Sequence, residues 1–145
     1  MVMKASQYSL LIIRQFEGLR LTAYRCPSGI WTIGYGHTNN VRKGDTITQD
    51  KAIEYLLLDI EPIEAYLNSL QLNINQNQFD ALTSLIFNIG ISAFSGSTLL
   101  NIIRQNPDTP AIADEFRRWI HSNGKTLPGL QHRREEEIKL YFLKV

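Results

Sequence analysis

The chain has 145 residues, 43% hydrophobic and 20% charged, close to globular averages, which excludes a disordered or fibrous protein. This length suits one compact domain that buries a core of its own. Fifteen Lys and Arg against 14 Asp and Glu give a formal charge of +1, which argues against a nucleic-acid binder, since such proteins need strongly basic surfaces.

The cysteine content and the lengths of the apolar runs exclude further classes of protein. Cys26 is the single cysteine, so an intrachain disulfide is impossible, and the Cys and His residues lack zinc-ligand spacing. No stretch approaches the roughly 18 apolar residues of a membrane span, and the first sixteen residues lack a secretory apolar run. We therefore expect a chain without metal or other cofactor and without stable membrane insertion, folding in a reducing cytoplasm.

The first third of the chain predicts a helix followed by a small β-element. Ser6 is a suitable N-cap for a helix that reaches about Phe16. Residues 21–25 and 30–34 are rich in β-branched and aromatic side chains and flank a turn with Pro27 and Gly29, which is typical of a β-hairpin. A third short strand is predicted near Val41.

The rest of the sequence has helical periodicity. Thr48 is a candidate N-cap for a long helix, and Pro62 predicts a kink there or a break at Glu61. Asn75 and Gln78 have capping-box spacing and open a helix that ends near Gly90.

Three further helices are predicted, at 97–105, at 110–120 with Thr109 as its cap, and at 129–142. The predicted fold class is α+β, with a small β-lobe at about 17–47 and a helical lobe at about 48–145 that includes the N-terminal helix. We expect one domain over 1–145, with the active site in the cleft between the lobes.

Three side chains that could take part in catalysis lie in or next to the predicted hairpin. Glu17 stands where the first helix ends, Cys26 lies at the turn, and Thr32 lies on the returning strand. Because a hairpin folds its two strands together, Cys26 and Thr32 should lie near one edge. A carboxyl at the helix end would line the same groove.

This spacing resembles the catalytic triad of the phage lysozymes of glycoside hydrolase family 24, whose middle residue is Asp or, in some members, Cys. The resemblance covers nearly the whole chain and includes both the lambdoid and the T-even type, with the lambdoid type closer at the central and C-terminal motifs. It rests on ordered motifs: Glu17-Gly-Leu-Arg-Leu21, Trp31-Thr-Ile-Gly-Tyr-Gly-His37, Gln76-Asn-Gln-Phe-Asp-Ala-Leu82, Phe87-Asn-Ile-Gly90, Gly96-Ser-Thr-Leu-Leu100, Phe116-Arg-Arg-Trp119 and Gly129-Leu-Gln-His-Arg-Arg134.

The resemblance implies a lysozyme-like fold and an N-acetylmuramidase that hydrolyses the β-1,4 bond between N-acetylmuramic acid and N-acetylglucosamine. Glycoside hydrolysis needs a protonated acid at the leaving oxygen and a second group that activates water or captures the sugar. Glu17 would be that acid, kept protonated by burial or by a neighbouring negative charge. The hydroxyl of Thr32 would hold the attacking water.

Cys26 occupies the middle position of the triad, where Asp is the commoner family residue. A free thiol with a pKa near 8.5 is only ~3% thiolate at pH 7, which makes it a poorer base than Asp but still a good nucleophile. Cys26 could instead be a small buried hydrophobe before the turn. Whether it acts as base or as nucleophile stays open.

The resemblance also implies roles outside the triad. His37 matches a residue that pairs with an acid on the long helix, here Asp59, and Arg133 or Arg134 matches the partner of Glu17. Thr38, Phe87 and Ser97 match substrate-contacting positions. The segment 117–134 contains five Lys and Arg and no acid, which suggests a basic stripe or simply a solvated face.

The implied partners are peptidoglycan glycan strands. The enzyme would accumulate as a monomer in the bacterial host cytoplasm and reach the wall once a holin permeabilises the membrane, causing cell lysis. Two alternatives remain at this stage. One is a non-catalytic wall-binding module, and the other is a Cys26–His37 amidase or peptidase acting on the stem peptide.

Overall fold

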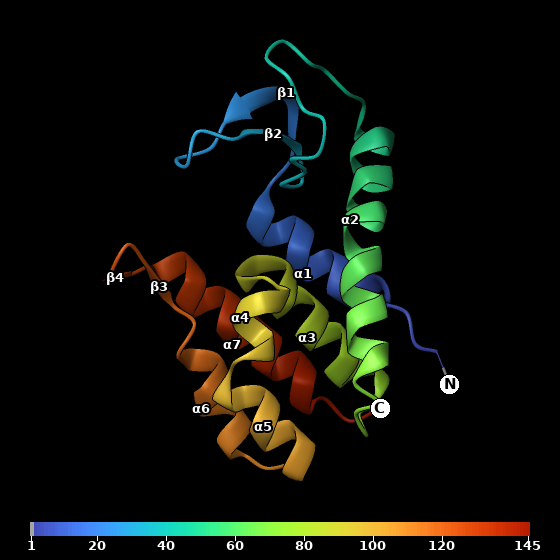
Figure 1. Ribbon diagram of the computed structural model, residues 1–145, viewed down its shortest axis with the longest axis vertical. Coiled ribbons are helices and arrows are strands. Elements are labelled where there is room, and N and C mark those ends of the chain that lie inside the picture. Colours follow the sequence, from blue (N-terminus) through green and yellow to red (C-terminus); the bar gives the residue numbers. More distant parts are fainter. Residues whose placement is uncertain (1) are drawn as a thin grey trace.

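The computed structural model describes residues 2–145, and it is mostly helical with one small antiparallel hairpin near its N-terminus (Figure 1). Helix α1 (Gln7–Glu17) leads into strands β1 (Arg20–Arg25) and β2 (Trp31–Gly34), which pair with each other. The predicted first helix and hairpin are therefore confirmed. Ser6 caps α1, because its side chain accepts a hydrogen bond from the Tyr8 amide.

The third strand is not near Val41. The backbone instead returns to β1 five residues later, where Thr46 forms an isolated bridge with Thr22. The Ala23 amide donates to Asp45 O at 2.9 Å, and the Ile47 amide donates to Leu21 O at 2.9 Å. This pairing covers the free edge of the hairpin.

The long helix α2 (Gln49–Ser69) connects the hairpin lobe to the helical lobe and runs through Pro62 without interruption. The predicted break at Glu61 is wrong. Pro62 is exposed, so the carbonyl that loses its amide partner lies on the solvent side, while Ile60 and Ile63 anchor the inner face of the helix. Thr48 is the N-cap, as predicted.

The remaining elements form the helical lobe around α3 (Gln76–Ile89), whose capping box at Asn75 and Gln78 is confirmed. They are α4 (Ile91–Ser95), α5 (Thr98–Gln105), α6 (Ala111–Arg117), β3 (His121–Ser122), β4 (Lys125–Thr126) and α7 (Pro128–Phe142). Every residue of α3 from Asn77 to Ile86 is buried, and α3 packs against α1, α2 and α7. The main apolar core surrounds this helix, and a smaller one joins α1 to α2.

Helix α6 departs from the prediction at both ends. It begins after Pro110 rather than at a Thr109 cap, and it ends at Arg117 because the chain turns into the β3–β4 hairpin. Asn123 and Gly124 form the turn of that hairpin with positive φ angles of 52° and 76°. These are the two left-handed positions that a type I′ turn requires.

Both ends of the described chain are attached beside the turn between α2 and α3. The Met3 amide donates to Asn68 Oδ1 at 2.8 Å, at the end of α2. Asn77, at the start of α3, donates to Leu143 O at 3.0 Å. The two ends therefore lie at the far end of α2 from the hairpin.

Candidate active site

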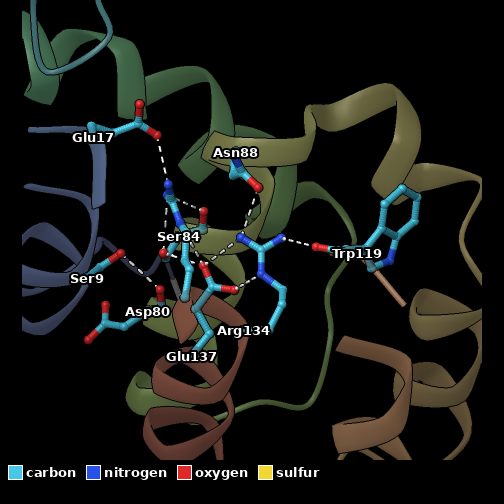
Figure 2. A network of polar contacts seen from close by, with 9 residues as sticks. Ser9, Glu17, Asp80, Ser84, Asn88, Trp119, Arg134 and Glu137 are labelled. Atoms are coloured by element: carbon cyan, nitrogen blue, oxygen red, sulfur yellow. Dashed lines mark hydrogen bonds and ion pairs between the residues drawn. The ribbon is translucent and has the colours of Figure 1, made fainter. Parts of the chain in front are cut away.

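Glu17 is the last residue of α1, and its carboxylate stands at the junction of the two lobes. Its side chain is 23% exposed, and Oε2 accepts a hydrogen bond from Arg133 Nη1 of α7 at 2.8 Å (Figure 2). Of the two arginines predicted as partners, Arg133 is thus the one that binds Glu17. The Arg133 side chain is 3% exposed, so the carboxylate meets a buried cation on one side and solvent on the other.

The loop after β2 reaches the same carboxylate. Gly36 has a φ of +79°, and a Cβ placed on it would lie 3.0 Å from Glu17 Oε1 and 3.9 Å from Phe87 Cε1. Only glycine adopts this conformation without strain and leaves room for the carboxylate. The β2 loop and α1 thus approach each other closely beside Glu17.

Two hollows flank this junction. One, of about 440 Å³, is lined by Glu17 and Arg133 together with Asn88 and the first turn of α7. The other, of about 320 Å³, is lined by Gly36, Thr38 and Phe87. One hollow is therefore lined by the Glu17 carboxylate, and the other contains two of the three predicted substrate-contacting residues.

The third such residue, Ser97, lies elsewhere. It is buried and caps α5, where its hydroxyl donates to Phe94 O at 2.6 Å and accepts from the Leu100 amide at 3.1 Å. Ser97 lines a separate hollow with Trp119. The structure thus brings Thr38 and Phe87 together and gives Ser97 a capping role.

Cys26 opens the tight turn of the hairpin. Its carbonyl accepts from the Gly29 amide at 2.7 Å, and its Sγ lies 2.9 Å from Ser28 Oγ. The hydrogen bond from Ser28 is the largest cause that lowers the pKa of the Cys26 thiol from 9.0 to about 7; slight burial opposes it, and backbone groups at Ile30 and Ser28 and the Thr32 hydroxyl assist. The Cys26 thiol therefore ionises closer to neutral pH than expected from the sequence.

Thr32 lies on β2 opposite Tyr24, close to the thiol. It is 3% exposed, and its hydroxyl donates to Ile30 O at 3.0 Å. The hairpin therefore brings Cys26 and Thr32 together, as its folding predicts. Glu17 belongs to α1, three residues before the first strand begins.

His37 pairs with Asp59 of α2, as predicted. Nδ1 lies 2.8 Å from Asp59 Oδ2, and the imidazole stacks on Tyr55 at 4.1 Å between ring centroids. The groups that act on the Cys26 thiol are Ser28, Ile30 and Thr32. His37 thus connects the two lobes through Asp59 and Tyr55. This pairing does not favour the alternative of a Cys26–His37 amidase or peptidase.

Of the two interpretations of the segment 117–134, the basic stripe is not favoured, because acids outside the segment pair with its four arginines. Arg117 pairs with Glu135 at 2.8 Å, and Arg118 pairs with Glu115 at 3.1 Å. Arg134 pairs with the fully buried Glu137 at 2.8 Å.

Sequence reasoning missed two polar groups at this site, Ser28 and Glu137. The spacing of Arg133, Arg134 and Glu137 places them within one turn of a helix, a signal that could have identified the buried cluster. Among residues 2–145, no group of three or more His, Cys, Asp or Glu side chains is arranged to hold a metal ion. In the same residues, no helix combines the length and apolar character that crossing a membrane requires.

Comparison with known proteins gives the chain its family. The phage lysozyme family model matches residues 14–137. The chain is 46% identical over 144 residues to an endolysin of Acyrthosiphon pisum secondary endosymbiont phage 1, covering 96% of this chain and 98% of the relative. It is 42% identical to an endolysin of Salmonella phage P22, with coverages of 97% and 99%.

The fold agrees with this assignment. The muramidase domain of SpmX from Asticaccaulis excentricus superposes with a TM-score of 0.90 at 38% identity, and the match covers 97% of this chain and 99% of that domain. The α+β, lysozyme-like fold predicted from the sequence is therefore confirmed. Since the family model spans most of the chain and the relatives align over nearly their whole length, the chain belongs to the phage lysozyme family.

Proposed function

We propose that this chain is an endolysin with N-acetylmuramidase activity, which hydrolyses the β-1,4 bond between N-acetylmuramic acid and N-acetylglucosamine in peptidoglycan. The setting of Glu17 carries this proposal. A partly exposed carboxylate at a helix end, held by a buried arginine and lining a hollow, suits a proton donor to a bound glycan. Family membership and the names of the relatives support the same function.

In the proposed reaction, Glu17 donates a proton to the leaving glycosidic oxygen as the bond to the sugar C1 breaks. The Cys26 thiolate is the second group. As a base it takes a proton from a water that attacks C1, and as a nucleophile it forms a sulfur–C1 bond that water then hydrolyses. The thiolate population at neutral pH supports either role for Cys26. Thr32, next to the thiol, would orient the water.

The first-formed anomer separates the two roles of Cys26. One displacement by water inverts C1, whereas two successive displacements retain its configuration. Proton NMR of the first minutes of hydrolysis of a defined glycan reads this outcome directly.

For the wider setting, we propose glycan strands of peptidoglycan as the partner, with Thr38 and Phe87 contacting the saccharide in one hollow and Ser97 contacting it in the separate hollow that it lines with Trp119. The enzyme acts as a monomer without a cofactor. It resides in the host cytoplasm until a holin permeabilises the membrane, and it then acts on the cell wall.

The test is Glu17→Gln, with Glu61→Gln on the exposed face of α2 as the matched control. We expect the first variant to lose turbidity clearing of permeabilised cells while keeping its circular dichroism spectrum, and the control to keep both. Digests by the unchanged protein should gain new reducing ends.

Each other result counts against the proposal. Release of free amino groups instead of reducing ends would indicate an amidase or peptidase. Binding to cell walls without any cleavage would indicate a wall-binding module. Near-normal activity of Glu17→Gln would remove Glu17 from the mechanism.

A further inference from the structure

A buried acid lies behind the arginine that holds Glu17. Glu137 on α7 has no exposed surface, and its carboxylate accepts a hydrogen bond from Ser84 Oγ of α3 at 2.5 Å. Arg133 Nε lies 3.3 Å away and Arg134 Nε lies 2.8 Å away. Figure 2 shows Ser84, Arg134 and Glu137 of this cluster close together, with Glu17 above them.

Arg133 connects the buried acid to the cleft. Its Nη1 donates to Glu17, its Nε donates to Glu137, and its Nη2 donates to the Ser84 carbonyl at 3.0 Å. A planar guanidinium bound on three sides cannot rotate without breaking one of these contacts. The position of Glu17 therefore depends on Glu137, although the two carboxylates belong to different helices.

The charges of the cluster also bear on Glu17. Arg133 and Arg134 are both buried and both remain charged, since arginine keeps its proton in proteins. Glu137 is the buried anion between them. Burial raises the pKa of Glu137, and the two guanidiniums and the Ser84 hydroxyl, which favour the carboxylate, reduce that rise without cancelling it. With Glu137 ionised and Glu17 protonated, the cluster carries one net positive charge; ionisation of Glu17 makes it neutral.

We propose that Glu137 is a positioning and charge-balancing residue for the reaction: through Arg133 it fixes the Glu17 carboxyl, and its negative charge offsets the two buried guanidiniums behind Glu17. This inference rests on the proposed function. Without Glu137, two uncompensated guanidiniums would stabilise the ionised form of Glu17.

The other charged groups near α1 are engaged elsewhere. His132 stacks edge-on against Phe16 and lies 3.5 Å from Glu136. Asp80 of α3 binds the Ser6 amide at the opposite end of α1. Arg14 donates to the Tyr35 hydroxyl at 3.1 Å. Arg133 is thus the charged group that contacts Glu17 directly, and Arg134 and Glu137 lie behind it.

The first test is Glu137→Gln, which keeps the shape and removes the charge. We expect the alkaline limb of the pH–activity profile to move about one pH unit toward acid. Arg134→Gln removes a cation from the same cluster, so we expect the limb to move in the opposite direction. The double variant restores the balance and should return the limb close to its original position. The matched control is Glu135→Gln, an exposed acid on the same helix that binds Arg117, and it should leave the limb unmoved.

A second measurement separates this inference from the proposed function. Carbon-13 NMR titration of the Glu17 side chain reads its protonation without turnover, so it applies even if the protein cleaves no glycan. The midpoint should move toward acid in Glu137→Gln and toward alkali in Arg134→Gln. If Glu137→Gln does not fold, the sign of the Arg134→Gln shift decides.

Opposite shifts support charge balancing, since damage to packing would not reverse sign between the two variants. Unmoved midpoints, or shifts of the same sign, would overturn the inference. If the unchanged protein produced no new reducing ends, this would refute the proposed function, and the titration result would still stand.

Discussion

Ser28→Ala tests whether the hairpin turn activates the Cys26 thiol. The Ser28 hydroxyl, 2.9 Å from Sγ, is the largest single cause that lowers the thiol pKa to about 7. Removing this one hydrogen bond to a charged acceptor should raise the pKa of Cys26 by about one unit. At pH 7 the thiolate fraction would fall from about one half to about one tenth, and the rate of thiolate chemistry would fall about fivefold.

The assay is alkylation by iodoacetamide, followed by intact mass over a series of pH values. Because Cys26 is the only cysteine, each added carbamidomethyl group reports on it alone. We expect the rate to rise with a midpoint near pH 7 in the unchanged protein and near pH 8 in Ser28→Ala. Ser95→Ala, an exposed serine on α4, is the control and should match the unchanged protein.

Two results would refute this reasoning. A midpoint at or above about pH 8.5 in the unchanged protein would mean that the turn leaves the thiol ordinary. An unchanged midpoint in Ser28→Ala would mean that another group sets the thiolate fraction. Bacteriolysis measured alongside shows whether activity follows the thiolate.

Four further substitutions extend the test. Cys26→Asp should remain bacteriolytic, with the acid limb of its turbidity-clearing profile at lower pH because Asp ionises near pH 3.9. Thr32→Ala should lower kcat on soluble glycans by about tenfold while KM changes less, if the hydroxyl orients water. Gly36→Ala should cost about 1–2 kcal/mol in thermal unfolding and lower kcat, because its Cβ would lie 3.0 Å from Glu17 Oε1 at a left-handed φ. Leu85→Ala, fully buried in α3, should cost about 3 kcal/mol in urea unfolding.

Much of the fold could be predicted because local signals and tertiary packing agree. Ser6, Thr48 and Asn75 are N-caps in the structure, and the apolar periodicity that follows each one faces the core. The break predicted at Glu61 was wrong because a proline ends a helix only where packing of the neighbouring residues does not compensate for the lost hydrogen bond. Here the buried side chains on either side outweigh one missing hydrogen bond.

The candidate site was predictable only in part. Glu17, Cys26 and Thr32 were chosen from spacing and resemblance, and their catalytic roles stay predictions. The low pKa of Cys26 depends on a hydroxyl two residues away, whose orientation exists only in the folded turn. Likewise, Glu137 looks like one of three consecutive surface acids until α3 and α7 enclose it.

The β3–β4 hairpin was missed although its signal is strong. Asn123 and Gly124 are the residue pair that favours a two-residue hairpin turn, but strands of only two residues have no readable alternation. Because the hairpin was not recognised, the helix predicted over 110–120 ran on past Arg117, where α6 ends.

The attachment of both ends beside the α2–α3 turn has a practical consequence for engineering. A passenger domain fused at either end would emerge near Asn68 and Asn77, roughly 30 Å along the 21-residue α2 from the hairpin. Such chimeras should therefore leave the β1–β2 hairpin, with Cys26 and Thr32, unobstructed. A short linker joining the old ends would also allow new ones to be opened elsewhere, for instance at the exposed β3–β4 tip.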